Sequence, residues 1–259
     1  MSTPPTPSRE ETLEEIVKSA KRGAVPIRSS FVQQRDATDQ PVPGPLRTFA
    51  HRGRHSALLQ YLLARTWASG GDYELTYHPS VWIRAMGLPN DDAGRRTLRR
   101  NWQLLRDLQL VSTRRSGRLL TITLLCEDGS GASYEHPGKA GGYFKLPHGF
   151  WMDGYHERLS LPETTLLLIS LTLGDWFWMP QERGAAWYGL SPSTMQRGLR
   201  GLVGRGILLR EKHYKPAPLA PEGYTEQLHY CLEPPFGPKG TLAKTAPAAM
   251  RVTGEDRPS

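Results

Sequence analysis

A run of arginines follows one predicted helix at a spacing that suits binding to a polyanion. The side chains concerned are Arg95, Arg96, Arg99, Arg100 and Gln103. At about 100° per residue, Arg96, Arg100 and Gln103 point away from the apolar stripe of the same segment, and Arg99 lies on its flank. Guanidinium and amide groups can hydrogen-bond guanine or adenine edges in a major groove and pair with phosphates. The segment is therefore a candidate DNA-reading helix, with a solvated charged helix face as the alternative.

Three further arginines follow on a predicted hairpin. Arg114, Arg115 and Arg118 surround a Ser-Gly turn, between Leu110-Val111 and a β-rich run over residues 119–126. A turn that carries three guanidinium groups could lie along phosphates or enter a narrow minor groove. The hairpin is expected to stand beside the arginine-bearing helix and to extend its cationic surface.

The distribution of charge agrees with this interpretation. The chain has 259 residues and a formal net charge of +8, and residues 51–125 alone carry 12 basic and 5 acidic side chains. Residues 1–50 sum to +1 and residues 126–259 to zero. The preference for Arg over Lys would also follow from the codon usage of a GC-rich genome, but codon usage does not explain the clustering. A local basic surface is typical of nucleic-acid binding.

The elements around these residues come in an order that occurs twice. In the first half, the sequence predicts a helix from residue 54 to about 69, a strand over 73–77, a helix opened by His78-Pro79-Ser80, a helix capped by Asn90 or Asp91, and the hairpin. After a strand-like segment over 143–146, residues 161–173 and 181–188 predict two helices. Ser191 caps a third, and residues 206–232 predict a second hairpin.

The second copy offers fewer candidate contacts. With Met195, Leu199 and Leu202 as the buried stripe of its third helix, the outward face holds Ser193, Arg197 and Arg200. Its hairpin mixes acidic with basic residues. This copy is expected either to bind DNA more weakly than the first or to supply a surface for a partner protein.

The order of these elements resembles the winged-helix branch of the helix-turn-helix proteins, and the stretch SPSTMQRGLRGLVGRGILL is similar to the recognition helix and first wing strand of bacterial regulators. The resemblance covers roughly residues 54–126 and 143–232. It implies a mainly α protein with small β-hairpins, of the α+β class, built from two winged-helix domains in tandem. A tandem pair also looks like the two halves of plasmid replication initiators. The resemblance implies sequence-specific binding of double-stranded DNA without catalysis, most simply by a transcription regulator, with a replication initiator as the alternative.

The expected organisation has five parts. We expect a mostly disordered segment over 1–46 with one short amphipathic helix after Ser8 and a proline-rich linker over 36–46, and a first, basic domain over 47–126. A flexible, glycine-rich joint over 127–142, a second domain over 143–234 and a disordered tail over 235–259 would follow.

Two segments could contact a partner protein. The N-terminal helix could pair with a second copy of the chain or pack on its own domain. The aromatic patch of Trp176, Phe177 and Trp178 could be an exposed dimer contact or could complete the core of the second domain. A protein-interaction scaffold is therefore the alternative from another functional class.

Other classes of function find no support in the sequence. Cys126 and Cys231 are the only cysteines, so there is no disulfide framework and no CxxC zinc site. Asp153, His156 and Glu157 come closest to a metal or acid/base site, but no second His or Cys stands at ligand spacing. The longest apolar run, residues 166–173, is about half of the roughly 20 residues that span a membrane. We predict a cytoplasmic protein that is not an enzyme, with no metal, cofactor or membrane association.

Overall fold

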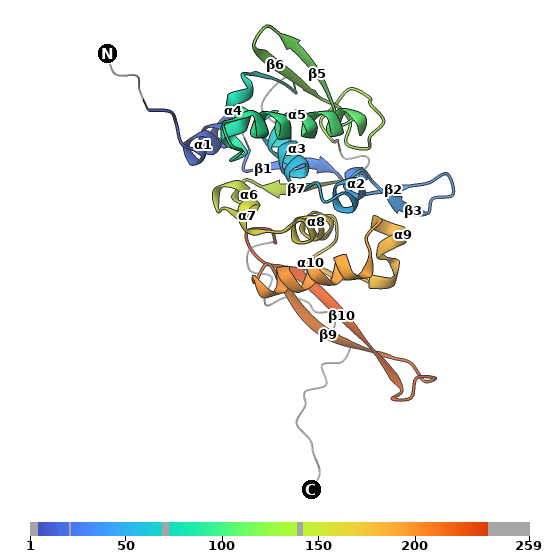
Figure 1. Ribbon diagram of the computed structural model, residues 1–259. Coiled ribbons are helices and arrows are strands. Elements are labelled where there is room, and N and C mark those ends of the chain that lie inside the picture. The colour runs from blue at the N-terminus through green and yellow to red at the C-terminus, as the bar shows by residue number, and fades with distance from the viewer. Residues whose placement is uncertain (1–4, 21, 69–72, 139–141, 238–259) are drawn as a thin grey trace.

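A computed structural model describes residues 5–20, 22–68, 73–138 and 142–237 of the chain. The fold mixes helices with short antiparallel sheets, so the predicted α+β class is confirmed at this level. Figure 1 shows helices and sheets stacked around a central pair of strands.

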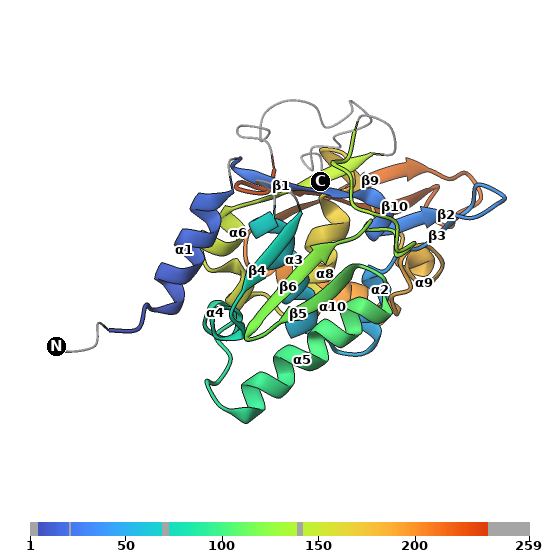
Figure 2. The same ribbon diagram turned by 90° about the horizontal axis from the view of Figure 1, so that it is seen from above.

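The first unit has the predicted order of helices and strands. Its elements are α2 (Leu46–His51), α3 (His55–Trp67), β4 (Glu74–Tyr77), α4 (Pro79–Ala85), α5 (Asp92–Asp107), β5 (Val111–Ser116) and β6 (Leu119–Leu124). The strands form one antiparallel sheet in the order β4-β6-β5. Figure 2 shows the three strands in this order, with β5 beside α5.

The second unit repeats this arrangement. It contains β7 (Tyr143–Pro147), α6 (Gly149–Met152), α7 (Tyr155–Arg158), α8 (Leu161–Ser170), β8 (Trp176–Trp178), a 3-10 turn η3 (Gln181–Arg183), α9 (Gly184–Tyr188), α10 (Pro192–Gly204), β9 (Leu208–Pro216) and β10 (Tyr224–Leu232). Its sheet has the order β8-β10-β9, which matches β4-β6-β5 position by position. The two halves therefore share one topology.

The segment before residue 47 is ordered from residue 22 onward, so the predicted disorder and the linker over 36–46 are wrong. β1 (Ala24–Arg28) pairs with β7, η1 (Ser29–Phe31) follows, and β2 (Gln33–Arg35) and β3 (Pro41–Pro43) form a hairpin. The Asp36 carboxylate closes the hairpin turn by accepting hydrogen bonds from the backbone N–H groups of Thr38 and Gln40 at 2.8 and 3.0 Å. The prolines are tolerated because β1 and β3 each pair with a single neighbouring strand.

The predicted flexible joint is also largely ordered. Glu127 is fully buried and forms ion pairs with Arg28 at 2.7 Å and Arg65 at 3.0 Å. Arg65 donates hydrogen bonds to the Tyr134 hydroxyl and the Pro26 carbonyl, and its guanidinium lies 4.1 Å from the centroid of the Tyr134 ring. Burial is the largest influence on the pKa of Arg65 and lowers it, but the Glu127 carboxylate together with Tyr61 and Tyr134 outweighs burial, so the pKa is raised. This network fixes the segment over 127–138 on the first unit; residues 139–141 of the predicted joint lie outside the described residues.

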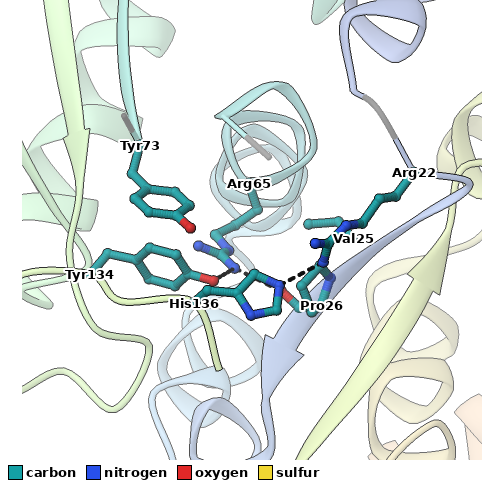
Figure 3. Close-up of a pocket in the computed structure, with 7 residues that line it drawn as sticks. All are labelled: Arg22, Val25, Pro26, Arg65, Tyr73, Tyr134 and His136. Atoms are coloured by element: carbon teal, nitrogen blue, oxygen red, sulfur yellow. Dashed lines mark hydrogen bonds between the residues drawn. The ribbon is translucent and has the colours of Figure 1, made fainter. Parts of the chain in front are cut away.

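Figure 3 shows the small cavity beside this network, where the hydrogen-bonded Arg65 and Tyr134 lie next to the hydrogen-bonded Arg22–His136 pair. Its volume is about 10 Å³, which is room for roughly one water molecule. The cavity is therefore part of the packing of the first unit and is too small for an organic ligand.

The β1–β7 pair joins the two units. It crosses the middle of the molecule, with α3 and α5 on one side and α8 and α10 on the other (Figure 1). The buried apolar side chains of both units belong to one continuous core. The hairpins β5–β6 and β9–β10 point away from each other at opposite ends of the stack.

The N-terminal helix α1 (Arg9–Ser19) packs on its own chain. Its predicted capping box is confirmed, because Ser8 and Glu11 exchange hydrogen bonds between side chain and backbone. Leu13 and Ile16 are buried against α3, α4 and α6. The apolar face that could have formed a dimer is therefore occupied within the chain.

The C-terminal boundary is later than expected by a few residues. Phe236 is buried and packs on Tyr155 with ring centroids 4.8 Å apart, so residues 235–237 belong to the second unit. The rest of the predicted tail lies outside the described residues.

Candidate nucleic-acid interface

The helix α5 is held rigidly by the side opposite its arginines. Leu98, Trp102 and Leu105 are buried, as the apolar periodicity predicts. Asp91 caps the helix by accepting a hydrogen bond from the Gly94 N–H at 2.9 Å. The capped helix thus rests on the core of the first unit.

A polar contact fixes the position of α5 relative to α3. The Asn101 Nδ2 group donates hydrogen bonds to Ser56 Oγ and Gln60 Oε1, both at 2.9 Å. Because the backbone of α5 is already held in place, binding through this helix costs no ordering of its backbone, only of its exposed side chains.

The exposed face of α5 lines a groove with a volume of about 970 Å³. Residues of the hairpin β5–β6 and of the start of α4 line the same groove. Seven of the predicted site residues line this groove, namely Arg95, Arg96, Arg99, Arg100, Gln103, Arg115 and Arg118. The structure therefore brings together the helix and hairpin side chains that the sequence predicts as neighbours.

Arg114 is separated from this group. It lies on the other face of β5, where its guanidinium is 3.7 Å from the Glu74 carboxylate on β4. Side chains alternate between the two faces of a strand, so consecutive arginines on β5 cannot share one face. The structure therefore places Arg114 outside the groove that Arg115 lines and does not bring these two side chains together.

Some polar side chains of the groove already have a partner within the chain, and others do not. Arg95 is paired with Asp92 at 3.1 Å, and Gln103 donates a hydrogen bond to Asp107 at 2.7 Å. Arg106, which also lines the groove, contacts Gln103 and donates to Thr113 Oγ1 at 2.7 Å. Five exposed arginines form no ion pair within the described part of the chain. They are Arg96, Arg99, Arg100, Arg115 and Arg118.

Five polar residues of this groove are absent from the predicted site. Arg106 and Thr113 belong to α5 and β5, and the other three lie at helix starts. His78 and Ser80 at the start of α4, and Asn90 before α5, also line it. Each stands at or beside a helix start, and the topology of the repeat places both helix starts near the groove. Helix-start position is therefore the signal that could have found them.

In the second unit, α10 also presents its predicted polar face to solvent. Met195, Leu199 and Leu202 are buried, and Ser193, Arg197 and Arg200 are exposed. A much smaller hollow, about 110 Å³, lies between α10 and the β9–β10 hairpin and includes Arg200 but not Ser193 or Arg197. The three residues therefore share an exposed helix face but not one groove.

Acidic partners reduce the positive charge of the second unit. Lys212 pairs with Glu226 at 3.0 Å across the hairpin. Arg205 donates a hydrogen bond to Glu163 at 2.8 Å, and although burial raises the pKa of Glu163, hydrogen bonds from Arg205 and Ser160 lower it overall. The unit is thus less suited to attract a polyanion than the first.

The aromatic patch is divided by the pleat of β8. Phe177 is buried against Tyr230, Trp176 is half-buried, and Trp178 remains 42% exposed. One tryptophan, rather than a three-residue patch, is therefore left for a contact between copies of the chain.

Comparison of the chain with models of protein families, with curated proteins and with solved structures found no match. Among the described residues, no three His, Cys, Asp or Glu side chains are grouped so that they could hold a metal ion. No helix in the described ranges is both long and apolar enough to cross a membrane.

Proposed function

We propose that both units are winged helices and that the protein binds double-stranded DNA through the first of them. The observation that carries this proposal is the groove in which five arginines from α5 and the β5–β6 hairpin, with no ion pair among the described residues, face solvent together. The repeated strand order and the position of each hairpin after a third helix support the winged-helix assignment.

The division of labour within the groove follows from its chemistry. Arg96, Arg99 and Arg100, on the exposed face of a capped helix, can reach guanine edges in a major groove. Arg115 and Arg118, near the hairpin turn, are placed to hold flanking phosphates or enter the minor groove. Gln103 is already hydrogen-bonded to Asp107 and would have to exchange this partner to contact adenine.

The second unit would contribute a weaker contact. Ser193, Arg197 and Arg200 form one exposed face on α10, but its hairpin carries acidic partners for its cations. Whether the protein serves transcription or replication depends on the site it reads. A footprint over a short palindrome would support a regulator, and a footprint over an array of direct repeats would support a replication initiator.

The proposal is tested by fluorescence anisotropy with a labelled 30-base-pair duplex over a salt series. The variant is Arg96→Gln/Arg99→Gln/Arg100→Gln, and the control is Lys18→Gln/Arg22→Gln/Lys145→Gln, which removes the same charge outside the groove. We expect the first variant to bind more weakly by about 1 to 3 kcal/mol for each base-reading arginine lost, and the control to keep the affinity and salt slope of the unaltered chain.

Equal binding by both variants would reject the groove as the DNA site. Absence of binding by the unaltered chain at low salt would reject DNA binding altogether and would favour protein docking by the two units.

A further inference from the structure

A second group of basic side chains, without ion pairs among the described residues, lies at the junction of the two units. Arg47 and His51 on α2, and Arg52 and Arg54 in the turn that follows, are all exposed. None of them forms an ion pair within the described ranges of the chain. We call these four residues the seam cluster. It was not predicted, because the sequence places it next to a presumed linker.

One side of the seam cluster touches the second unit. Arg47, His51 and Arg52 line a cavity of about 490 Å³ whose opposite wall includes Ala185 and Gly189. A Cβ atom on Gly189 would lie only 2.9 Å from the Arg47 Cβ, so the two backbones approach closely here. Gly189 ends α9, and α10 begins three residues later. The cluster therefore reaches the start of the third helix of the second unit.

On its other side, the seam cluster is connected to α5 through the first turn of α3. Arg54 directly precedes α3, whose first turn contacts both units. His55 Nε2 is 3.1 Å from Thr164 Oγ1 of α8, and Ser56 Oγ accepts a hydrogen bond from Asn101 of α5 at 2.9 Å. Asn101 is the neighbour of Arg100, which lines the DNA groove. The seam cluster thus lies between the two third helices, as the position of α2 in Figure 1 also indicates.

We propose that the seam cluster binds phosphates of the same duplex that occupies the α5 groove, so that one duplex extends across both units. This inference rests on the proposed function and extends it from one unit to two. Clustered like charges without acidic partners are unfavourable for the free protein and become favourable when a polyanion neutralises them. Contacts of this kind position the duplex without reading its sequence.

The chemistry of the cavity favours a nucleic-acid backbone over a protein surface. Its charged lining residues are all basic, and the remaining ones are Pro43, Thr48, Ala185 and Gly189. This lining has no aromatic or large aliphatic side chain that could anchor a protein partner, whereas hot spots of protein interfaces are typically aromatic residues or arginines in well-packed pockets.

The test compares Arg47→Gln/Arg52→Gln/Arg54→Gln with the Lys18→Gln/Arg22→Gln/Lys145→Gln control in the same salt series. If each arginine holds one phosphate, the slope for the 30-base-pair duplex falls by up to about 2.7 in the seam variant. The control, with the same net charge, is expected to keep the slope of the unaltered chain. Arg52→Gln alone, which leaves the Arg47–Gly189 contact intact, should lower the slope by about 0.9 and guards against loss of folding in the triple variant.

If the seam variants match the control while the Arg96/Arg99/Arg100 variant loses binding, the seam cluster does not touch DNA and the proposed function stands. If the unaltered chain does not bind DNA, both proposals fail.

Discussion

Two adjacent arginines on β5 give the sharpest test of the groove, because the strand places them on opposite faces. Arg115 lines the groove and has no ion pair in the described chain, whereas Arg114 faces Glu74 on the far side of the hairpin. Arg115→Gln and Arg114→Gln change the net charge by the same amount and lie one residue apart. Any difference in DNA binding between the two variants therefore shows which face of β5 contacts the DNA.

The expected size of the difference follows from counterion release. One lost phosphate contact lowers the salt slope by about 0.9, which at 0.1 M salt corresponds to about an eightfold loss of affinity, or about 1.2 kcal/mol. Arg114 is 77% exposed and its ion pair is a surface pair of the kind that contributes about 0 to 1 kcal/mol. Arg114→Gln should therefore leave the slope unchanged and the affinity within about twofold.

Anisotropy titrations of both variants and the unaltered chain, at four or more salt concentrations with one duplex, provide the measurement. Circular dichroism of each variant controls for folding. If Arg114→Gln weakens binding as much as Arg115→Gln, or if neither variant changes the slope, Arg115 does not contact DNA from the groove face.

Further predictions concern stability. Glu127→Gln leaves Arg65 buried without its carboxylate partner, so urea denaturation should show a loss of about 3 to 5 kcal/mol, whereas Glu226→Gln at the surface should cost no more than about 1 kcal/mol. A similar cost for both would contradict the buried network. Four histidines have a pKa that is lowered mainly by burial. In the unfolded chain the same histidines have an ordinary pKa near 6.5, so the unfolded chain binds protons more readily than the folded one. The free energy of unfolding should therefore fall as the pH drops from 7 to 5. The four histidines are His55, His148, His156 and His229. Stability that stays constant over this range would be the contrary result.

The elements that the sequence predicts well are those specified by local signals. The helix α5 follows from the spacing of Leu98, Trp102 and Leu105, and the capping of α10 by Ser191 follows from its side chain and the proline after it. Periodicity and capping depend on residues a few positions apart, so a single sequence contains them.

The errors arise where distant segments meet. β1 and β7 are separated by more than a hundred residues. The sequence marks β7 as strand-like over 143–146, but nothing local to β1 shows that it pairs with this distant segment. The region after residue 126 is glycine-rich, yet it is ordered because Glu127 finds partners in Arg28 and Arg65. Glycine content predicts flexibility only where no long-range contact fixes the backbone.

One part of the candidate site could have been predicted more accurately. Alternation along a strand already places Arg114 and Arg115 on opposite faces once residues 111–116 are assigned as a strand. The seam cluster, by contrast, depends on how the two units pack, which no local pattern specifies.

The salt dependence of DNA binding by the unaltered chain tests the central claim most directly. With Arg115 and Arg118 of the groove on phosphates, each adding about 0.9, log K against log salt for a 30-base-pair duplex should have a slope of about −1.8 or steeper. No binding at low salt, or binding with a slope near zero, would contradict a phosphate-anchored interface.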